Sequence, residues 1–188
     1  MTNLSDIRDR ASLQAYMSAG NPVKFLFFWG HRPHPDRITK SCLSQWWLAE
    51  FTVDGITYES AEQYMMAEKA RLFGDEAMLA RILAAGSPAE AKKLGRLIAN
   101  FDEATWERRR FEIVVDASVA KFGQNEPEGN FLRNTQGRVL VEASPQDRIW
   151  GIGMDERNRA AANPEQWRGD NLLGFALMEA RQRLSQTH

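Results

Sequence analysis

The chain has 188 residues, of which 43% are hydrophobic and 26% charged, as is usual for a soluble globular protein with a sizeable core. Lysine and arginine number 24 against 25 aspartates and glutamates, so the net charge is −1. This balance predicts no general attraction to nucleic acid or to an anionic membrane. The single cysteine, Cys42, excludes an internal disulfide and suits a reducing compartment. With no signal peptide and no apolar run of spanning length, we expect a cytoplasmic protein without a membrane partner.

The histidines give no sign of a metal site. His31 and His34 lie in a proline-containing loop and His188 is the last residue, and none has a ligand-like spacing to another histidine or to cysteine. The sequence therefore predicts neither a metal nor a bound cofactor.

The first part of the chain predicts one helix, one strand and one hairpin. Residues 5–19 should form a short amphipathic helix that begins at Ser5 and ends before Gly20. Residues 24–29 are aromatic-rich and predict a buried strand. Asp54-Gly55 lies between two β-rich triplets and is typical of a two-residue hairpin turn.

The centre of the chain predicts helices with clear starts. Ser60 with Gln63 forms a capping-box pattern, and the helix after it should run to about Leu72. A second helix should cover residues 75–85. Ser87-Pro88 predicts the next start, and Asp102 should cap a long helix over residues 103–122.

The last third predicts one helical turn at 130–133, a short strand at 139–141 and a final helix from Asp170 to about Leu184. No repeat or long linker is present. We expect a mainly α protein: a single compact helical domain over residues 23–188 with a small β-sheet or hairpin, preceded by an accessory helix within residues 1–22.

Glu62 and Lys69 are the first candidates for chemistry. Seven residues make nearly two helical turns, so both side chains leave one face about 10 Å apart along the axis. Glu62 would move protons, and Lys69 would act as a charge partner or as an amine nucleophile. The alternative is an ordinary solvated helix with an acid near its start and a base near its end.

A second candidate is the segment Ile149–Gly153. Gly151 and Gly153 would let backbone N–H groups approach a phosphate, and Trp150 offers a ring for base stacking. The dinucleotide fingerprint is incomplete because Glu156 occupies its third glycine position. The alternative is a buried tryptophan before a turn.

The third candidate is the start of the final helix, where Asp170 would be the cap and exposed N–H groups would bind an anion. Asn171 would hydrogen-bond a ribose hydroxyl or a base edge. Capping without any ligand is the alternative. Elsewhere, Trp46 and Trp47 could wall a pocket with one ring in the core and one at its rim, and Arg96 could join Lys92 in a basic patch.

The order of these motifs along residues 24–184 resembles the NADAR (YbiA-like) family. The matching blocks are FLFFWG, LSQWW (43–47), VDGITYESAEQYMMAEKA (53–70), SPAEAKKLGR (87–96), W-x-x-x-R (106–110), AKFGQN (120–125), FLRNTQGRVLVEAS (131–144), IWGIG (149–153) and GDNLLGFALMEAR (169–181). The sequence departs from the family pattern at Gln45-Trp46-Trp47, where Asn and then aromatic residues are usual, and at Gln63, where histidine is usual.

The resemblance implies a NADAR-type fold and an N-glycosidase that cleaves the bond between a ribose phosphate and an exocyclic base amine. Family members act on ribosylamino-pyrimidine phosphates of riboflavin synthesis or remove ADP-ribose from guanine. The partner implied is therefore a small ribosylated molecule, or ADP-ribosylated guanine within nucleic acid.

The resemblance also implies roles for the candidate residues. Glu62 would be the general acid and base, and Lys69 a charge partner or Schiff-base amine. The remaining candidates would bind substrate: Trp150 with Trp46 or Trp47 on the base, and Arg96, Gly151, Gly153 and Asn171 on phosphate and sugar.

Two other functions stay open from the sequence. A non-catalytic ADP-ribose-binding module would need the stacking ring and the phosphate loop but neither Glu62 nor Lys69. A nucleic-acid-binding helical domain is disfavoured by the net charge of −1.

Overall fold

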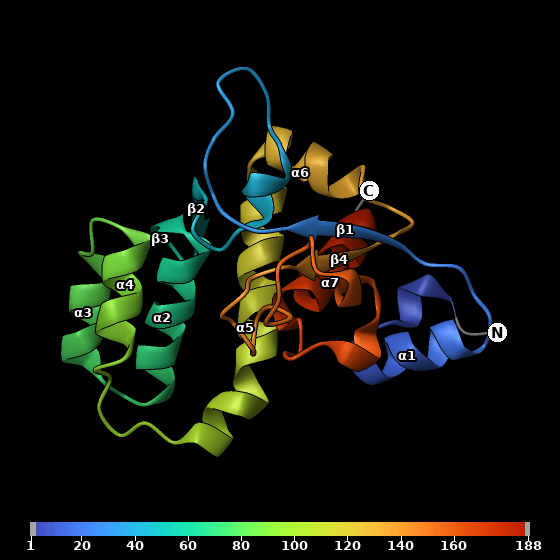
Figure 1. The fold of residues 1–188 in the computed structure, drawn as a ribbon. Helices are drawn as coiled ribbons and strands as arrows, with labels where there is room; N and C mark the ends of the chain where they lie inside the picture. Colours follow the sequence, from blue (N-terminus) through green and yellow to red (C-terminus); the bar gives the residue numbers. More distant parts are fainter. Residues whose placement is uncertain (1–2, 187–188) are drawn as a thin grey trace. The chain divides into compact units, whose positions relative to one another are not determined.

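The computed structural model describes residues 3–186. The chain forms two compact units, one from residues up to 44 together with those from 130 onward, and one from residues 45–129. Helices predominate and the strands are few, which confirms the helix-rich class with a small amount of sheet (Figure 1). The expected boundary after residue 22 does not coincide with the division between the units. A single domain over residues 23–188 stays a prediction.

The discontinuous unit is built on a parallel strand pair. Strand β1 (Lys24–Phe28) pairs with β4 (Arg138–Glu142), with Phe25 opposite Val139. The central residues of β4 are fully buried, and helix α7 (Leu172–Gln186) packs against this strand. A Cβ atom on Gly174 of α7 would lie 2.1 Å from the Leu140 carbonyl oxygen, so glycine is needed for this close approach.

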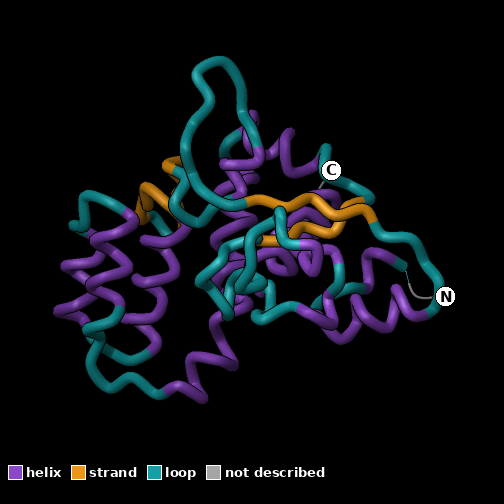
Figure 2. The backbone as a smooth tube through the Cα atoms, viewed as in Figure 1, coloured by secondary structure: helices purple, strands orange, loops and turns teal. Residues whose placement is uncertain are grey.

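The N-terminal segment of this unit differs from the prediction. Instead of one helix from Ser5, the chain forms a short 3-10 turn, η1 (Leu4–Asp6), and then α1 (Arg10–Ser18). The predicted start was wrong because Asp9 is the cap, and its carboxylate accepts the Ser12 N–H at 2.7 Å. A long loop then joins β1 to η2 (Lys40–Leu43) (Figure 2). The unit also contains η3 (Arg159–Ala162) and η4 (Pro164–Gln166).

The continuous unit begins with the predicted hairpin. Strands β2 (Leu48–Val53) and β3 (Ile56–Ser60) are antiparallel, and both Asp54 and Gly55 have positive φ, as the two-residue turn requires. The hairpin is anchored by rings, because Tyr58 stacks on Phe51 of the opposite strand with ring centroids 5.8 Å apart.

Four helices follow, and α2 packs against the other three (Figure 1). Their starts confirm the predicted caps Ser60, Ser87 and Asp102, each of which accepts a backbone N–H of the first turn. Asp75, which was predicted as the first residue of its helix, is a fourth cap of the same kind. The helices are α2 (Ala61–Leu72), α3 (Glu76–Leu83), α4 (Pro88–Gly95) and α5 (Glu103–Gln124).

Two predicted boundaries near the end of the chain were wrong. The single turn expected at 130–133 is the end of an eight-residue helix, α6 (Glu126–Arg133). The final helix begins at Leu172 rather than at Asp170. The residue before it, Asn171, has φ 54°, a left-handed conformation outside a right-handed helix.

The contact of α2 with α4 depends on Gly95. A Cβ atom there would lie 2.0 Å from the Met66 sulfur and 2.9 Å from its Cγ atom. Met66 is itself only 6% exposed, so its side chain has little free space in which to move.

We therefore expect Gly95→Ala to lower the free energy of unfolding by about 1–3 kcal/mol, the usual cost of overpacking. Met66→Ala in the same chain should restore part of the loss. Urea unfolding measures both. Gly86→Ala is the matched control, because the nearest atom to a Cβ there is 3.8 Å away. A Gly95→Ala variant as stable as Gly86→Ala would contradict this packing.

Candidate active site

Helix α2 carries the two candidate catalytic side chains. The Ser60 hydroxyl accepts the Gln63 N–H at 3.2 Å and fixes the start of the helix, so Glu62 lies in the first turn and Lys69 in the last. The N-terminal half of this helix is buried all round, because other elements pack against it. The solvated helix face that the sequence left as the alternative does not exist at Glu62.

Glu62 is a buried carboxylate, with only 4% of its surface exposed. Its backbone N–H donates to the Gln45 carbonyl at 3.0 Å, which joins the helix start to the segment before β2. The helix dipole favours a negative charge at this end. A carboxylate withdrawn from water in this way is suited to moving protons rather than to keeping the protein soluble.

Lys69 is half-buried in a pocket of rings and backbone. Its Nζ atom donates to the Gly95 carbonyl at 3.0 Å and lies 4.4 Å from the centroid of the Phe101 ring and 5.4 Å from that of Trp106. These contacts hold the amine in one place, and the carbonyl and the ring faces stabilise its ammonium form.

Burial is the main influence on the charge of this amine and lowers the pKa of Lys69. The negative charges of Glu103 and Glu62 oppose the effect and raise this pKa, while the positive charge of Arg96 lowers it. Glu62, Lys69 and Arg96 are therefore coupled electrostatically. Arg96 is exposed at the end of α4, which leaves its guanidinium open to a ligand.

The two neighbouring tryptophans divide as expected between core and rim. Trp47 is 7% exposed, and its indole N–H donates to the Glu128 carboxylate at 3.1 Å. The ring of Trp46 is half-buried and lies 5.8 Å from the Lys92 Nζ atom. Trp46 is thus the member of the pair whose ring is partly exposed.

Gln63, which stands where the family pattern has histidine, is used inside the fold. Its side-chain oxygen accepts the Glu59 N–H at 2.8 Å, and its amide nitrogen donates to the carbonyls of Ile82 and Leu83 at 3.1 and 3.2 Å. The side chain therefore fastens the start of α2 to the end of α3.

The glycine segment expected to bind phosphate packs closely in the discontinuous unit. A Cβ atom on Gly151 would lie 2.9 Å from the Glu142 carbonyl oxygen, and Gly153 has φ 67°. The backbone N–H of Trp150 donates to the Asp147 carboxylate at 2.8 Å. The Trp150 ring is half-buried. Both glycines are needed for the fold of this loop, whether or not a ligand binds there.

The start of α7 does not offer the free N–H groups that the anion site required. The N–H groups of Asn171, Leu172 and Leu173 donate to carbonyls of residues 149–151 at 3.1 to 3.2 Å. Because these donors are already satisfied within the fold, the expected phosphate site at this helix start is not supported.

The Asn171 side chain is likewise used inside the fold. It is fully buried, its oxygen accepts the Glu142 N–H at 2.9 Å, and its nitrogen donates to the Leu140 carbonyl at 2.9 Å. This geometry favours the structural alternative over contact with ribose or base.

The candidates thus fall into two groups. Trp46, Trp47, Glu62, Lys69 and Arg96 belong to the unit of residues 45–129, and the four others to the discontinuous unit. Sequence reasoning missed the surroundings of Lys69. Trp106 stood only in the W-x-x-x-R block of the family resemblance, and nothing in the sequence indicated that Phe101, which is 42% exposed, reaches the amine.

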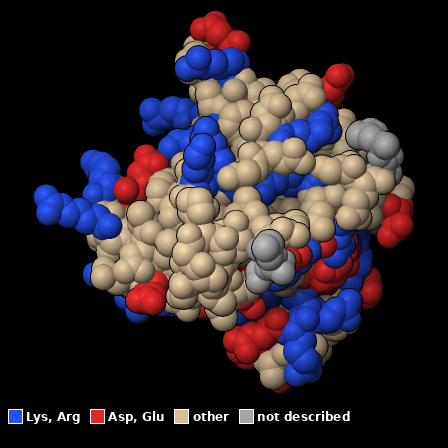
Figure 3. Space-filling model, turned by 90° about the vertical axis from the view of Figure 1, so that its right-hand side faces the viewer, with Lys and Arg blue, Asp and Glu red and all other residues tan. Residues whose placement is uncertain are grey.

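Within residues 3–186, no group of three or more His, Cys, Asp or Glu side chains is arranged to hold a metal ion. In the same residues, no helix has the length and apolar character needed to cross a membrane. Lysines and arginines are interspersed with acidic side chains over the face drawn in Figure 3.

Comparison with known proteins identifies the class. A family model described as the NADAR domain matches residues 27–185. N-glycosidase R617 of Acanthamoeba polyphaga mimivirus is 37% identical over 164 residues, which cover 85% of this chain and 95% of that protein. N-glycosidase YbiA of Escherichia coli (strain K12) is 32% identical over 133 residues, which cover 71% and 74%.

The fold agrees with these matches. The NMR structure of E. coli YbiA superimposes with a TM-score of 0.70 and 28% identity, over 87% of this chain and 86% of that one. The class of protein that these relatives and this fold define is an N-glycosidase, a hydrolase acting on N-glycosyl compounds. The chain belongs to the NADAR family.

We expect Asn171→Ala to lower the free energy of unfolding by about 2–5 kcal/mol without any ligand, because a part-buried N–H and a buried carbonyl each lose their partner. Urea unfolding measures the loss. Asn158→Ala is the control, since this exposed asparagine only caps η3 and its loss should cost about 1 kcal/mol. Equal stability of the two variants would point back to a ligand role for Asn171.

The charges around Lys69 make a second prediction. Glu62→Gln and Glu103→Gln should each lower the pKa of Lys69 further, because each removes a negative charge that stabilises the ammonium form. Arg96→Gln should raise it. NMR of isotope-labelled lysine side chains across a pH series measures the pKa. Glu107→Gln, at an exposed position of α5, should leave the pKa of Lys69 unchanged. A shift of equal size in this variant would refute a specific coupling of Lys69 to Glu62, Glu103 and Arg96.

Proposed function

We propose that this protein hydrolyses the bond between C1 of a phosphorylated ribose and the exocyclic amine of a base. One observation carries the proposal. A carboxylate and an amine, Glu62 and Lys69, are both withdrawn from water on one helix and are coupled by charge. The names of the N-glycosidase relatives support the reaction type and disfavour a module that only binds.

The first step would open the sugar ring. The lone pair of the exocyclic nitrogen forms a C1=N double bond, which gives a protonated imine, while the bond from C1 to the ring oxygen breaks. Glu62, in its acid form, gives its proton to that oxygen. The carboxylate left behind lies at the positive end of the α2 dipole, which stabilises it.

Two versions of the second step are open. In the first, the neutral amine of Lys69 attacks C1, the base leaves as a free amine after taking up a proton, and water then hydrolyses the lysine imine to release the sugar aldehyde. Burial of Lys69 favours this version because it favours the uncharged amine. In the second, water attacks C1 directly. One of its protons passes to the Glu62 carboxylate and the other to the base nitrogen, so the C1–N bond breaks and the base leaves as a free amine while C1 becomes the aldehyde. The Lys69 ammonium, held by the Gly95 carbonyl, stabilises the negative charge that develops on the oxygen.

The half-buried ring of Trp46 is proposed to stack on the base, with Trp47 supporting Trp46 from the core. Arg96 is proposed to pair with phosphate, since it is exposed and is coupled to Lys69. In the discontinuous unit, Trp150 stays a predicted stacking ring, and Gly151 and Gly153 stay predicted phosphate contacts. Asn171 is proposed to stabilise the fold beside the loop of Gly151 and Gly153, without itself binding the ligand.

The substrate is proposed to be a ribosylamino-pyrimidine phosphate, with ADP-ribosylated guanine as the other member of the class. Riboflavin biosynthesis protein VVA0006 of Vibrio vulnificus (strain YJ016) supports the first. It is 30% identical to this chain over 144 residues, which cover 77% of the chain and 35% of that protein. Incubation of the pure protein with both substrates should release free ribose phosphate from the first. Release of ADP-ribose from the second substrate, with no release from the first, would instead favour ADP-ribosylated guanine as the substrate.

Glu62→Gln should reduce kcat by about 10²–10⁴-fold while substrate affinity stays within a few-fold, because the amide keeps the shape but moves no proton. Steady-state turnover and calorimetric binding measure the two quantities. Glu59→Gln is the matched control, an exposed carboxylate on β3 whose loss should change neither. Full turnover in Glu62→Gln would disprove the acid–base role.

Borohydride separates the two versions of the second step. With substrate present, reduction should join the sugar to Lys69 and inactivate the protein if the lysine forms an imine. Peptide mass spectrometry locates the adduct. Lys69→Arg keeps the charge and removes the nucleophile, so it should abolish the adduct. Full activity in that variant, with no adduct in the wild-type protein, would leave only the charge-stabilising version.

A further inference from the structure

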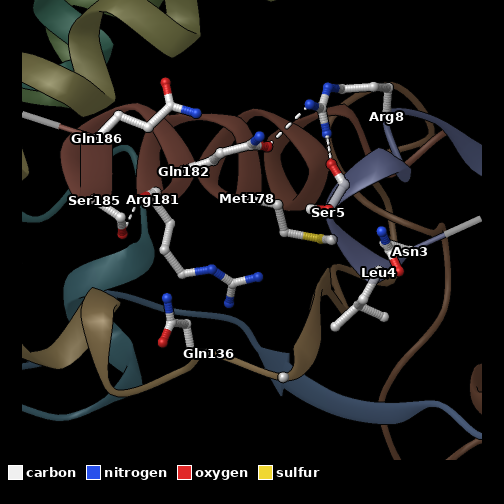
Figure 4. Close-up of a pocket in the computed structure, with 11 residues that line it drawn as sticks. Asn3, Leu4, Ser5, Arg8, Gln136, Met178, Arg181, Gln182, Ser185 and Gln186 are labelled. Carbon is white, nitrogen blue, oxygen red and sulfur yellow. Dashed lines mark hydrogen bonds between the residues drawn. The ribbon is translucent and has the colours of Figure 1, made fainter.

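A cavity lies within the discontinuous unit, and neither Glu62 nor Lys69 lines it. It has a volume of about 410 Å³ and is bounded by η1 and the following residues, by the turn before β4, and by α7 (Figure 4). This size falls within the usual range of small-molecule sites, roughly 300–1,000 Å³. Nothing in the proposed hydrolysis uses this cavity.

The wall of the cavity contains a buried cation, Arg181. It is 7% exposed and extends from α7 into the space beside Gln136 (Figure 4). Its guanidinium donates to the Thr135 carbonyl at 2.7 Å, the Thr135 hydroxyl at 2.8 Å and the Arg138 carbonyl at 3.2 Å. All of these acceptors are neutral, and within residues 3–186 no carboxylate forms an ion pair with Arg181.

A buried positive charge without an anion is energetically unfavourable, and hydrogen bonds to carbonyls offset only part of the cost. Burial accordingly lowers the pKa of Arg181, with no charged neighbour acting on it. An anion in the cavity would supply the missing counter-charge.

The remaining charges nearby do not neutralise Arg181. Arg8 lies at the rim, where its Nε atom pairs with the Glu179 carboxylate at 2.8 Å. The same carboxylate pairs with Arg183 at 2.9 Å. Neither ion pair of Glu179 includes Arg181.

The rest of the lining is rich in amides and hydroxyls. Gln136 and Ser185 lie on the turn before β4 and on α7. Gln182 also lies on α7, and its oxygen accepts from Arg8 at 2.9 Å, which leaves its amide N–H groups as donors (Figure 4). Such groups bind sugar hydroxyls better than they bind an apolar ligand.

We propose that this cavity is a second binding site, for a small phosphate monoester that carries hydroxyl groups, such as a sugar phosphate. Arg181 binds the phosphate, and Gln136, Gln182 and Ser185 bind the hydroxyls. Because residues 3–8 form one side of the cavity, the bound ligand bridges the N-terminal segment and α7 and holds that segment in place. The site does not depend on the proposed hydrolysis.

The test uses the full chain with ribose 5-phosphate as the probe, and inorganic phosphate and ribose as comparisons. Glu62→Gln should bind the probe at this site as the wild-type protein does. Calorimetry should give the order ribose 5-phosphate, inorganic phosphate, ribose, from tightest to weakest. Hydrogen exchange of the amides of residues 4–8 should slow in the presence of the probe, which active-site binding would not cause.

Single substitutions test which residues bind the probe. Arg181→Gln should weaken binding at least about ten-fold through loss of a charge-assisted hydrogen bond. Gln136→Ala should weaken it about three-fold. Arg159→Gln and Gln166→Ala are matched controls at exposed positions of η3 and η4, and they should bind normally. If Arg181→Gln does not fold, Gln136→Ala carries the test, because Gln136 is exposed and leaves the hydrogen bonds of Arg181 in place.

Three outcomes would overturn the proposal. They are no binding of either phosphate, unchanged affinity in both Gln136→Ala and Arg181→Gln, or unchanged hydrogen exchange of residues 4–8 when the probe is bound. In each case Arg181 would serve only to fasten the turn before β4. Since none of these readouts measures turnover, failure here is distinguishable from failure of the proposed hydrolysis.

Discussion

The candidate chemistry depends on how closely α4 can approach α2. Gly95 has no side chain, so Met66 fills the space beside it and the Gly95 carbonyl comes within 3.0 Å of the Lys69 amine. The same approach brings the chain after α4 back toward the end of α2, where Phe101 covers the amine. A larger residue at position 95 would disturb the packing and the surroundings of Lys69 together. Stability and the charge state of the lysine are therefore set by one contact.

Local sequence signals predicted the parts of the fold that short-range physics determines. Ser60, Ser87 and Asp102 cap helices because a side-chain oxygen meets an N–H group within one turn, whatever the rest of the chain does. Asp54-Gly55 likewise determines its own turn. The family resemblance was carried by many such blocks in order, and the match over residues 27–185 confirms it.

Features that depend on distant partners were not predictable. The pairing of β1 with β4 joins segments more than 100 residues apart, and no local pattern indicates which strand another will meet. Asn171 was predicted to contact a ligand because it stands at the start of the final helix, yet its partners are backbone groups near residue 141 that only the folded chain brings close. Of the candidate site, the sequence predicted the α2 pair but not the rings around Lys69, because Phe101 reaches Lys69 through a loop.

Gln63 has a consequence for how the helical part of this protein responds to acidity. Its amide bridges the start of α2 and the end of α3 through one acceptor and one donor group. An amide neither gains nor loses a proton near neutrality, whereas an imidazole at the same place would titrate there. The hydrogen bonds of Gln63 between α2 and α3 are therefore the same at mildly acidic and at neutral pH.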